Sequence, residues 1–254
     1  MSAPTILVVN CNTDAAMSEA IAGVARTAAS AGTRIVPVTP AWGPASAEGY
    51  VESFASAVAT MDAVAAHAEP FDAVVMAGFG EHGREGMRQL VRQPVVDITE
   101  ASAYLACLVA HRFGIVTTLP STLAGIDEAL RTIGLSGRCA AMLASGVPVL
   151  HAGTDPVATA DTLEATAREA LARGADAIVL GCAGFAGLDA ELERRLGVPV
   201  LDGVACATRL AEDLVALGKR TSTRGPYAPR DAAKHWEGPP LGARPAPPPS
   251  FPRR

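Results

Sequence analysis

Short apolar runs alternate with longer segments of helical periodicity along most of this chain. The runs are rich in Val and Ile and end in small or polar residues, which is typical of buried strands. The segments between them repeat apolar side chains every three or four positions, as amphipathic helices do. The runs predict strands at residues 5–9, 33–39, 73–77, 95–98, 114–117, 140–142, 177–180 and 198–201. The periodic segments predict helices at 17–28, 47–67, from loop 78–83 to 92, and at 100–110, 123–132, 158–173 and 204–217. This alternation predicts an α/β fold with mostly parallel sheets.

One stretch of the chain occurs twice. Residues 175–184 match residues 71–80 nearly position for position, and Cys182 stands 104 residues after Gly78 at the same point of the repeat. Two further pairs keep nearly the same spacing, 94–97 with 199–202 and, more loosely, 6–12 with 114–118. The repeat predicts two pseudo-symmetric lobes, each a mostly parallel four-stranded sheet flanked by helices. The first comprises residues 1–98 and 204–218, and the second comprises 99–203. Ligands bind at the carboxyl ends of parallel strands, so we expect the active site in the cleft between the lobes.

Composition narrows the class of protein. Hydrophobic residues make up 49% of the 254 positions but aromatic residues only 4%, so we expect a core of aliphatic side chains. The five cysteines show no CxxC spacing and no framework of the kind that small secreted domains use, which argues against disulfides and zinc. Residues 1–4 lead straight into the first strand without a signal peptide, and no apolar run is long enough to span a bilayer. We expect a cytoplasmic protein.

Charge and proline content set the end of the chain apart. Residues 219–254 hold eight of the 21 Lys and Arg, two of the 26 Asp and Glu, and nine of the 19 Pro. Residues 1–218 therefore carry 13 basic and 24 acidic residues, a net charge of −11. A basic, proline-rich segment without apolar periodicity predicts a disordered tail. Because its basic residues are spread out and the rest of the chain is acidic, we expect binding to neither nucleic acid nor membrane.

Cys182 is the strongest candidate for a reacting group. It follows a predicted buried strand, and a helix N-terminus at this point would favour the thiolate and lower the pKa of the thiol. A small buried core cysteine is the alternative interpretation. The neighbouring Gly181, Ala183 and Gly184 let the backbone approach a ligand closely, which favours a role in substrate binding and catalysis.

Polar side chains at other strand ends are expected to face the same cleft. They are Asn10 and Asn12 after the first strand, and Thr117 and Thr118 at the end of the fifth. Together with backbone N–H groups around Gly80 and Ala183, they would supply the donors that stabilise an enolate or a carboxylate. The alternative is that these side chains only cap strand ends and form turns.

Two loops of the first lobe carry further candidates. The Gly- and Pro-rich loop 40–46, which ends at Ser46, is either a lid over the pocket or a plain surface connection. Glu81 and His82, just after Phe79, are either an acid/base pair or a solvated pair in a polar loop. The chain has no phosphate-binding loop, nucleophile elbow or dinucleotide fingerprint after its first strand, and its other histidines are scattered. We expect chemistry with neither a metal nor a nucleotide cofactor.

Four motifs, in the same order along residues 5–218, resemble the aspartate/glutamate/hydantoin racemase superfamily, and within it the hydantoin and allantoin racemases most closely. Residues 9–13, Val-Asn-Cys-Asn-Thr, resemble the Asn-Pro-Asn-Thr opening of that family, and residues 43–50 resemble its Gly-Pro-x-Ser loop. Residues 114–119 and 179–184 resemble its second-lobe signatures. The resemblance implies an isomerase, a cofactor-independent racemase or epimerase acting on a hydantoin-like or related carbonyl-activated carbon acid.

In that family two cysteines face each other across the cleft. One removes the Cα proton as a thiolate, and the other returns a proton to the opposite face. Cys182 matches the second-lobe cysteine. At the first-lobe position the family reads Ala-Cys-Phe-Gly-Asp-Pro-Gly, whereas residues 77–83 read Ala-Gly-Phe-Gly-Glu-His-Gly, so Gly78 replaces the opposing acid/base. Cys11 and His82, which both stand where the family has a proline, are the candidate substitutes.

The glycine leaves other functions open. Arylmalonate decarboxylases of the same superfamily resemble this arrangement, with one cysteine on the second lobe and a glycine opposite. A one-sided proton transfer, as in decarboxylation or isomerisation, is therefore one alternative, and a non-catalytic protein that binds a small molecule is another. In each case we expect a small-molecule ligand beside Gly78, Phe79 and Gly80, and a homo-oligomer, the common state of soluble enzymes.

Overall fold

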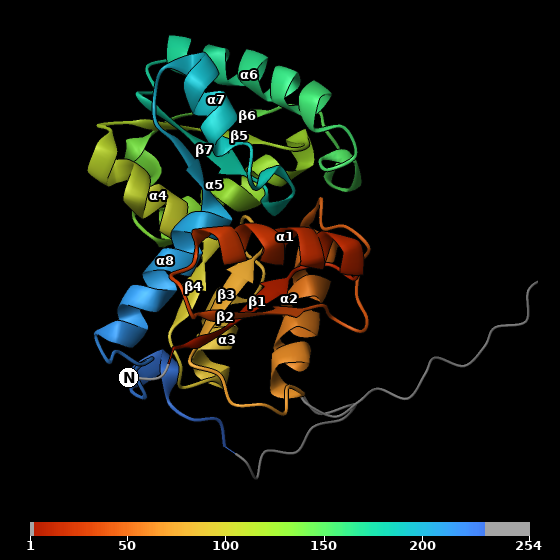
Figure 1. The fold of residues 1–254 in the computed structure, drawn as a ribbon, viewed down its shortest axis with the longest axis vertical. Helices are drawn as coiled ribbons and strands as arrows, with labels where there is room; N and C mark the ends of the chain where they lie inside the picture. Colours follow the sequence, from red (N-terminus) through yellow and green to blue (C-terminus); the bar gives the residue numbers. More distant parts are fainter. Residues whose placement is uncertain (1–2, 232–254) are drawn as a thin grey trace, which may run out of the picture.

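The computed structural model describes residues 3–231, which form two α/β lobes stacked one on the other (Figure 1). The first lobe contains a sheet ordered β2-β1-β3-β4, and the second a sheet ordered β6-β5-β7-β8. Within the described residues, all neighbouring strands run parallel. The strands are β1 (Thr5–Asn10), β2 (Arg34–Val38), β3 (Ala73–Ala77), β4 (Val95–Asp97), β5 (Phe113–Thr117), β6 (Cys139–Ala144), β7 (Ala177–Gly181) and β8 (Val200–Asp202). The predicted fold is confirmed.

Helices flank both sheets. They are α1 (Ala15–Ala28), α2 (Tyr50–Ala65), α3 (Arg84–Leu90), α4 (Ile98–Val109), α5 (Leu123–Thr132), α6 (Pro156–Ala172), α7 (Asp189–Leu196) and α8 (Gly203–Ala216). The sequence predicted all of these except α7. Leu192 is the one buried residue of α7. This helix therefore lacks the broad apolar face by which the other helices were predicted.

Two helices join the lobes. α8 leaves the end of β8 and returns to the first lobe, where it packs against α1, α4 and β3 (Figure 1). Its Val204 and Ala207 share a buried cluster with Ile6 of β1. α4 lies between the lobes, because Ala101 belongs to that first cluster while Ala106 packs in the core of the second sheet.

The strand register brings equivalent strand ends to the lobe interface. Asn10 pairs with Ala77 at the ends of β1 and β3, and Thr117 pairs with Gly181 at the ends of β5 and β7. β7 passes so close to β5 there that a Cβ on Gly181 would lie 2.9 Å from Thr117 Cβ. The residues that follow the two central strands, Gly78 and Cys182, therefore face the same region from opposite lobes.

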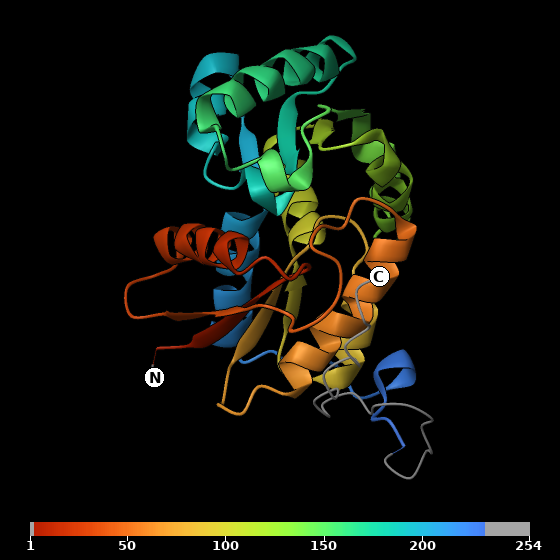
Figure 2. The same cartoon turned by 90° about the vertical axis from the view of Figure 1, so that its right-hand side faces the viewer.

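The chain after α8 lies against the first lobe as far as it is described (Figure 2). Thr221 donates hydrogen bonds to the Arg92 carbonyl at 3.1 Å and the Gln93 carbonyl at 2.7 Å. A short 3-10 turn, η5 (Gly225–Tyr227), packs on α3, and the Tyr227 hydroxyl donates to Glu85. The tail predicted to be disordered thus has an ordered beginning, residues 219–231, and residues 232–254 lie outside the described residues.

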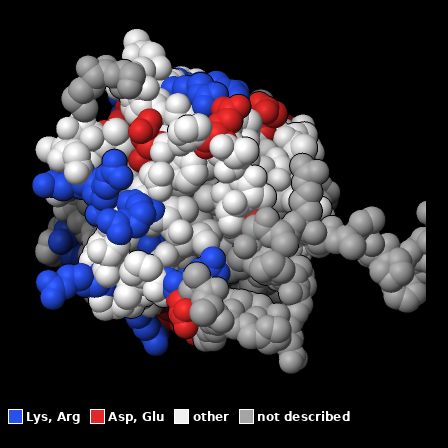
Figure 3. Space-filling view, turned by 90° about the horizontal axis from the view of Figure 1, so that it is seen from below, with Lys and Arg blue, Asp and Glu red and all other residues white. Residues whose placement is uncertain are grey.

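Seen from below, basic side chains gather on part of the surface beside a few acidic ones (Figure 3). Lys219, Arg220 and Arg224 at the described end of the chain are exposed. No helix among residues 3–231 combines the length and the apolar character needed to cross a membrane.

Candidate active site

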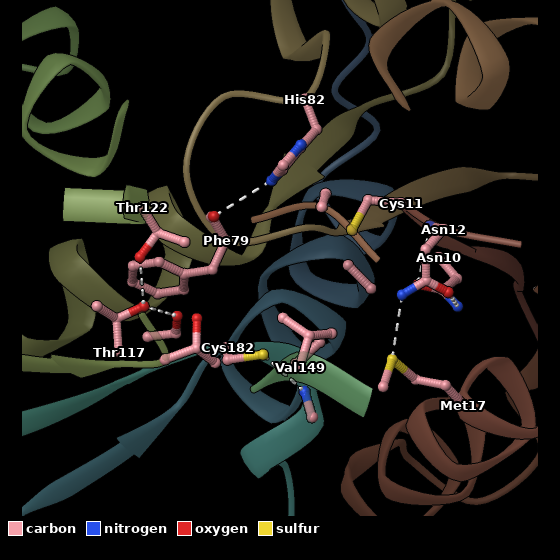
Figure 4. Close-up of a pocket in the computed structure, with 16 residues that line it drawn as sticks. Asn10, Cys11, Asn12, Met17, Phe79, His82, Thr117, Thr122, Val149 and Cys182 are labelled. Carbon is pink, nitrogen blue, oxygen red and sulfur yellow. Dashed lines mark hydrogen bonds between the residues drawn. The ribbon is translucent and has the colours of Figure 1, made fainter. Parts of the chain in front are cut away.

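An open cavity lies where the strand ends of the two lobes meet (Figure 4), and its space of about 410 Å³ includes solvent at the mouth. The loops after β1 and β3 form one wall, and the loops after β5 and β7 form the other. The lining residues are Asn10, Cys11, Asn12, Met17, Ala47, Ala77, Phe79, His82, Thr117, Thr118, Thr122, Val149, Gly181, Cys182, Ala183 and Gly184. The structure thus brings together most of the residues that the sequence singled out.

Cys182 directs its sulfur into this cavity from the end of β7 (Figure 4). It begins a three-residue 3-10 turn, η4 (Ala183–Phe185), and its Sγ accepts a hydrogen bond from the Gly184 N–H at 3.3 Å. The predicted lowering of its pKa by a helix N-terminus is wrong. Burial raises the pKa of the Cys182 thiol to about 11, because the single turn has too few aligned N–H groups to offset the loss of solvation.

Gly78 itself does not line the cavity, and the space that a side chain at this position would need is already filled. A Cβ on Gly78 would lie 2.4 Å from His82 Cδ2 and 2.8 Å from Cys11 Cβ. Both distances are shorter than a van der Waals contact between carbon atoms. Glycine at this position therefore makes room for the side chains of Cys11 and His82.

Cys11 belongs to the loop after β1, and its sulfur points into the cavity (Figure 4). Burial and, to a lesser extent, the negative charge of Cys182 together raise the pKa of its thiol to about 12. The two thiols are thus close enough for the ionisation of one to affect the other.

His82 is a buried residue, only 5% exposed, and not part of a solvated pair in a polar loop. Its Nε2 lies 3.2 Å from the Phe79 carbonyl oxygen, which can only accept, so Nε2 carries the proton. Burial lowers the pKa of His82, which keeps the ring neutral. Its Nδ1 is buried and has no hydrogen-bond partner within the described residues.

The four predicted donors divide into two pairs. Asn10 Nδ2 donates to Asn12 Oδ1 at 2.7 Å, and Thr117 Oγ1 donates to the Gly181 carbonyl at 2.8 Å. These two side chains therefore hold the loops in place, as the structural alternative predicted. Asn12 Nδ2 reaches only the weak acceptor Met17 Sδ, at 3.3 Å, and Thr118 Oγ1 has no hydrogen bond within the described residues. Asn12 and Thr118 remain available to a ligand.

Other predicted site residues lie beside the cavity without lining it. The Gly80 N–H donates to Thr99 Oγ1 at 2.8 Å, so this group is not available to an oxyanion. Gly80 faces a second cavity instead. Ser46 lines neither cavity, although its neighbour Ala47 lines both. The loop after Ser46 reaches across the lobes, where Glu48 accepts a hydrogen bond from the Val149 N–H at 2.8 Å.

Sequence reasoning missed several lining residues. Thr122 stands five residues after Thr117, and a hydroxyl so soon after a strand end was the one signal in the sequence that could have identified it. In the structure its hydroxyl lies 3.3 Å from that of Thr117. Met17 and Val149 are apolar and look like ordinary core positions in the sequence. Within residues 3–231 no cluster of three His, Cys, Asp or Glu side chains is placed to hold a metal ion.

Comparisons with known proteins agree with this geometry. Residues 6–211 match the model of the family described as Asp/Glu/Hydantoin racemase. A hydantoin racemase of Paenarthrobacter aurescens is 39% identical over 228 residues, which cover 87% of this chain and 95% of that protein. The crystal structure of an allantoin racemase from Pseudomonas fluorescens shares 48% identity with a TM-score of 0.90, over 92% of this chain and all of that one.

A more distant likeness concerns the fold alone. The crystal structure of an arylmalonate decarboxylase is 22% identical, with a TM-score of 0.60 over 88% of this chain and 97% of that one. The two-lobed arrangement is therefore shared well beyond the racemases.

Proposed function

Because this chain belongs to the Asp/Glu/hydantoin racemase family and is therefore an isomerase, we propose that it racemises a hydantoin-like carbon acid, with Cys182 and Cys11 moving the proton. One observation carries the proposal: the two thiols line a single cavity from opposite lobes (Figure 4). The first-lobe thiol comes from the loop after β1, and Gly78 leaves the room for it.

The reaction needs one thiolate and one thiol. The thiolate removes the proton from the reacting carbon, and the electron pair of the broken C–H bond moves to the adjacent carbonyl oxygen. The opposite thiol then gives its proton to the other face of the same carbon, and the two cysteines have exchanged their states. The amide of Asn12 and the hydroxyl of Thr118 are the free donors for the negative oxygen.

The electrostatics of the pair oppose the ionisation of both thiols at once. Burial raises the pKa of both thiols, to about 11 for Cys182 and about 12 for Cys11, so each thiolate is a strong base once formed. Part of the shift of Cys11 comes from the negative charge of Cys182. The loss of one proton therefore keeps the partner protonated, as a two-sided proton transfer requires.

His82 is less suited to the role of the second acid/base. Its Nε2 proton is bound to the Phe79 carbonyl, and its Nδ1 is buried. The ring packs where a Gly78 side chain would be, beside Cys11. We assign it to positioning Cys11 rather than to proton transfer.

The test follows deuterium uptake and optical rotation together in D₂O, by proton NMR and polarimetry, for each enantiomer of a 5-substituted hydantoin and of allantoin. A control without enzyme measures the spontaneous exchange. We expect uptake with loss of rotation from both enantiomers. Absence of uptake from either enantiomer of all these compounds, with folded protein, contradicts the proposal.

Gly78 favours one second candidate, a one-sided proton transfer. In that case only Cys182 acts, and the same experiment gives uptake from one enantiomer with its rotation retained. A malonate-type acid would then be the next substrate to try, with loss of CO₂ as the measured quantity.

A further inference from the structure

A second open cavity, of about 510 Å³, adjoins the one that holds the two thiols. Ala47, Phe79, His82 and Thr122 line both, so the two spaces meet at these side chains. Figure 4 shows Phe79, His82 and Thr122 on the side of the thiol cavity away from Met17. Residues at the start of α2 in the first lobe and on α5 in the second line this cavity. Figure 2 shows the ends of these two helices close to each other.

Four large apolar or aromatic side chains line this second cavity. Phe79 and Ile126 are two of them, and the other two, Tyr50 and Phe54, stack on each other along α2 with their ring centroids 6.0 Å apart. Gly125 of α5 opens the space further, since a Cβ there would lie 3.9 Å from Tyr50 Cε1. Such walls fit an aromatic ring better than a small polar group.

The charged side chains that line this cavity are acidic. Glu81 and Glu128 both line it, and none of the described lining residues is Lys or Arg. Glu81 is held by Arg84, 3.4 Å away, and by two backbone N–H groups. Glu128 Oε1 accepts a hydrogen bond from the Tyr50 hydroxyl at 3.0 Å, and its Oε2 has no hydrogen-bond partner within the described residues.

We propose that this cavity holds the substituent on the reacting carbon and selects an aromatic group that ends in a hydrogen-bond donor. The proposal rests on the proposed function, because it takes the thiol cavity as the place of the reacting carbon. The ring of the substituent lies between Phe79, Ile126 and Tyr50, and its terminal donor reaches Glu128. An anionic substituent is disfavoured, because Glu81 and Glu128 line the cavity and none of the described lining residues is Lys or Arg.

The experiment measures binding, which does not depend on catalysis. Two hydantoins without a proton on carbon 5, 5,5-dimethylhydantoin and 5-methyl-5-(4-hydroxybenzyl)hydantoin, are titrated by calorimetry into the full chain. A Gly125→Leu variant fills the second cavity, and Gly23→Leu on α1, where nothing lies within 4 Å of a new Cβ, is the matched helical control. We expect Gly125→Leu to weaken the hydroxybenzyl ligand about tenfold or more, with the dimethyl ligand within about twofold.

A Glu128→Gln variant tests the selection by charge. We expect it to reduce the preference for 4-hydroxybenzyl over benzyl and to improve the binding of a 2-carboxyethyl analogue. Equal effects of Gly125→Leu on the large and the small ligand, or none on either, overturn the proposal. If binding changes as expected but neither the 5-substituted hydantoins nor allantoin exchange the proton of the reacting carbon in D₂O, the cavity assignment stands and the racemase proposal fails.

Discussion

The two lobes present different groups at equivalent strand ends. After β7, Cys182 places a thiol in the cavity, and the Gly184 N–H contacts its sulfur. After β3, Gly78 has no side chain, and Cys11 and His82 occupy the space beside it. The thiol of the first lobe therefore comes from the loop of a neighbouring strand. Under the proposed mechanism, the position of the sulfur in the cavity matters and its position in the chain does not.

The aspartates that cap the helices after β4 and β8 also differ in their hydrogen bonds. Asp202 caps α8 with Oδ1 and accepts the Gly187 N–H with Oδ2 at 2.7 Å. Asp97 caps α4 in the same way, but its Oδ2 has no hydrogen-bond partner within the described residues. Burial raises the pKa of Asp97 to about 7, although the buried Arg84 opposes this shift. Asp97 of the first lobe thus has one carboxylate oxygen without a hydrogen bond, whereas both oxygens of Asp202 accept one.

Removing either cysteine should have the largest effect on activity and should separate the roles of the two lobes. Cys182→Ser should lower deuterium uptake by about 10²–10⁴-fold, because general acid–base help of that size is lost. Cys11→Ser should abolish racemisation but leave exchange on the one enantiomer that Cys182 serves. Both are measured in D₂O by NMR and polarimetry. Cys107→Ser, on α4 and outside both cavities, is the control, and full activity of Cys182→Ser would overturn the assignment.

The pH dependence tests the raised pKa values. Below the Cys182 pKa of about 11 the thiolate fraction grows about tenfold per pH unit, so uptake above the spontaneous rate should rise steadily from pH 7 to 9. Above pH 9 the fold itself loses stability, because both thiols are neutral in the folded state and ionise more easily once unfolded. A plateau of the rate near pH 7 would show a thiol with a lowered pKa.

A side chain at position 78 tests, through the stability of the fold, whether Cys11 and His82 fill that space. Gly78→Ala should destabilise the protein by about 1–3 kcal/mol, because its Cβ would overlap His82 and Cys11. Thermal unfolding measures the change, with Gly137→Ala, where nothing lies within 4 Å of a new Cβ, as control. Adding His82→Ala to Gly78→Ala should recover part of the loss. Additive effects of the two substitutions would show that the side chains do not compete for one space.

The smallest effect concerns the two capping aspartates. Because the pKa of Asp97 is raised from 3.8 to about 7, its contribution to stability is present at low pH and is lost as the pH rises through 7. Asp97→Asn keeps the capping oxygen and should make the melting temperature less dependent on pH between 4 and 7. Asp202→Asn, which places an amide against the Gly187 N–H, should instead lower it at every pH. The same pH profile in Asp97→Asn and wild type would contradict this account.

Much of the fold could be predicted from local pattern. The apolar runs predicted the strands, because buried parallel strands are apolar throughout and alternate with helices of clear periodicity. The order of the strands within each sheet came only from the structure. The helix α7 was missed because its residues are mostly polar and exposed. Residues 219–231 were predicted to be disordered from composition, whereas their hydrogen bonds to Arg92 and Gln93 depend on a surface that lies far away in the sequence.

The sequence by itself determined the internal repeat, the position of Cys182 after a central strand, and the presence of Gly78 at the matching point of the repeat. These are properties of spacing and residue type. Only the tertiary structure decided that Cys11 and His82 fill the space at Gly78, that Asn10 and Thr117 use their donors within the protein, and that the Cys182 pKa is raised. The physical reason is that burial and hydrogen-bond partners come from residues on other strands and on the opposite lobe, and the order of the chain does not specify them.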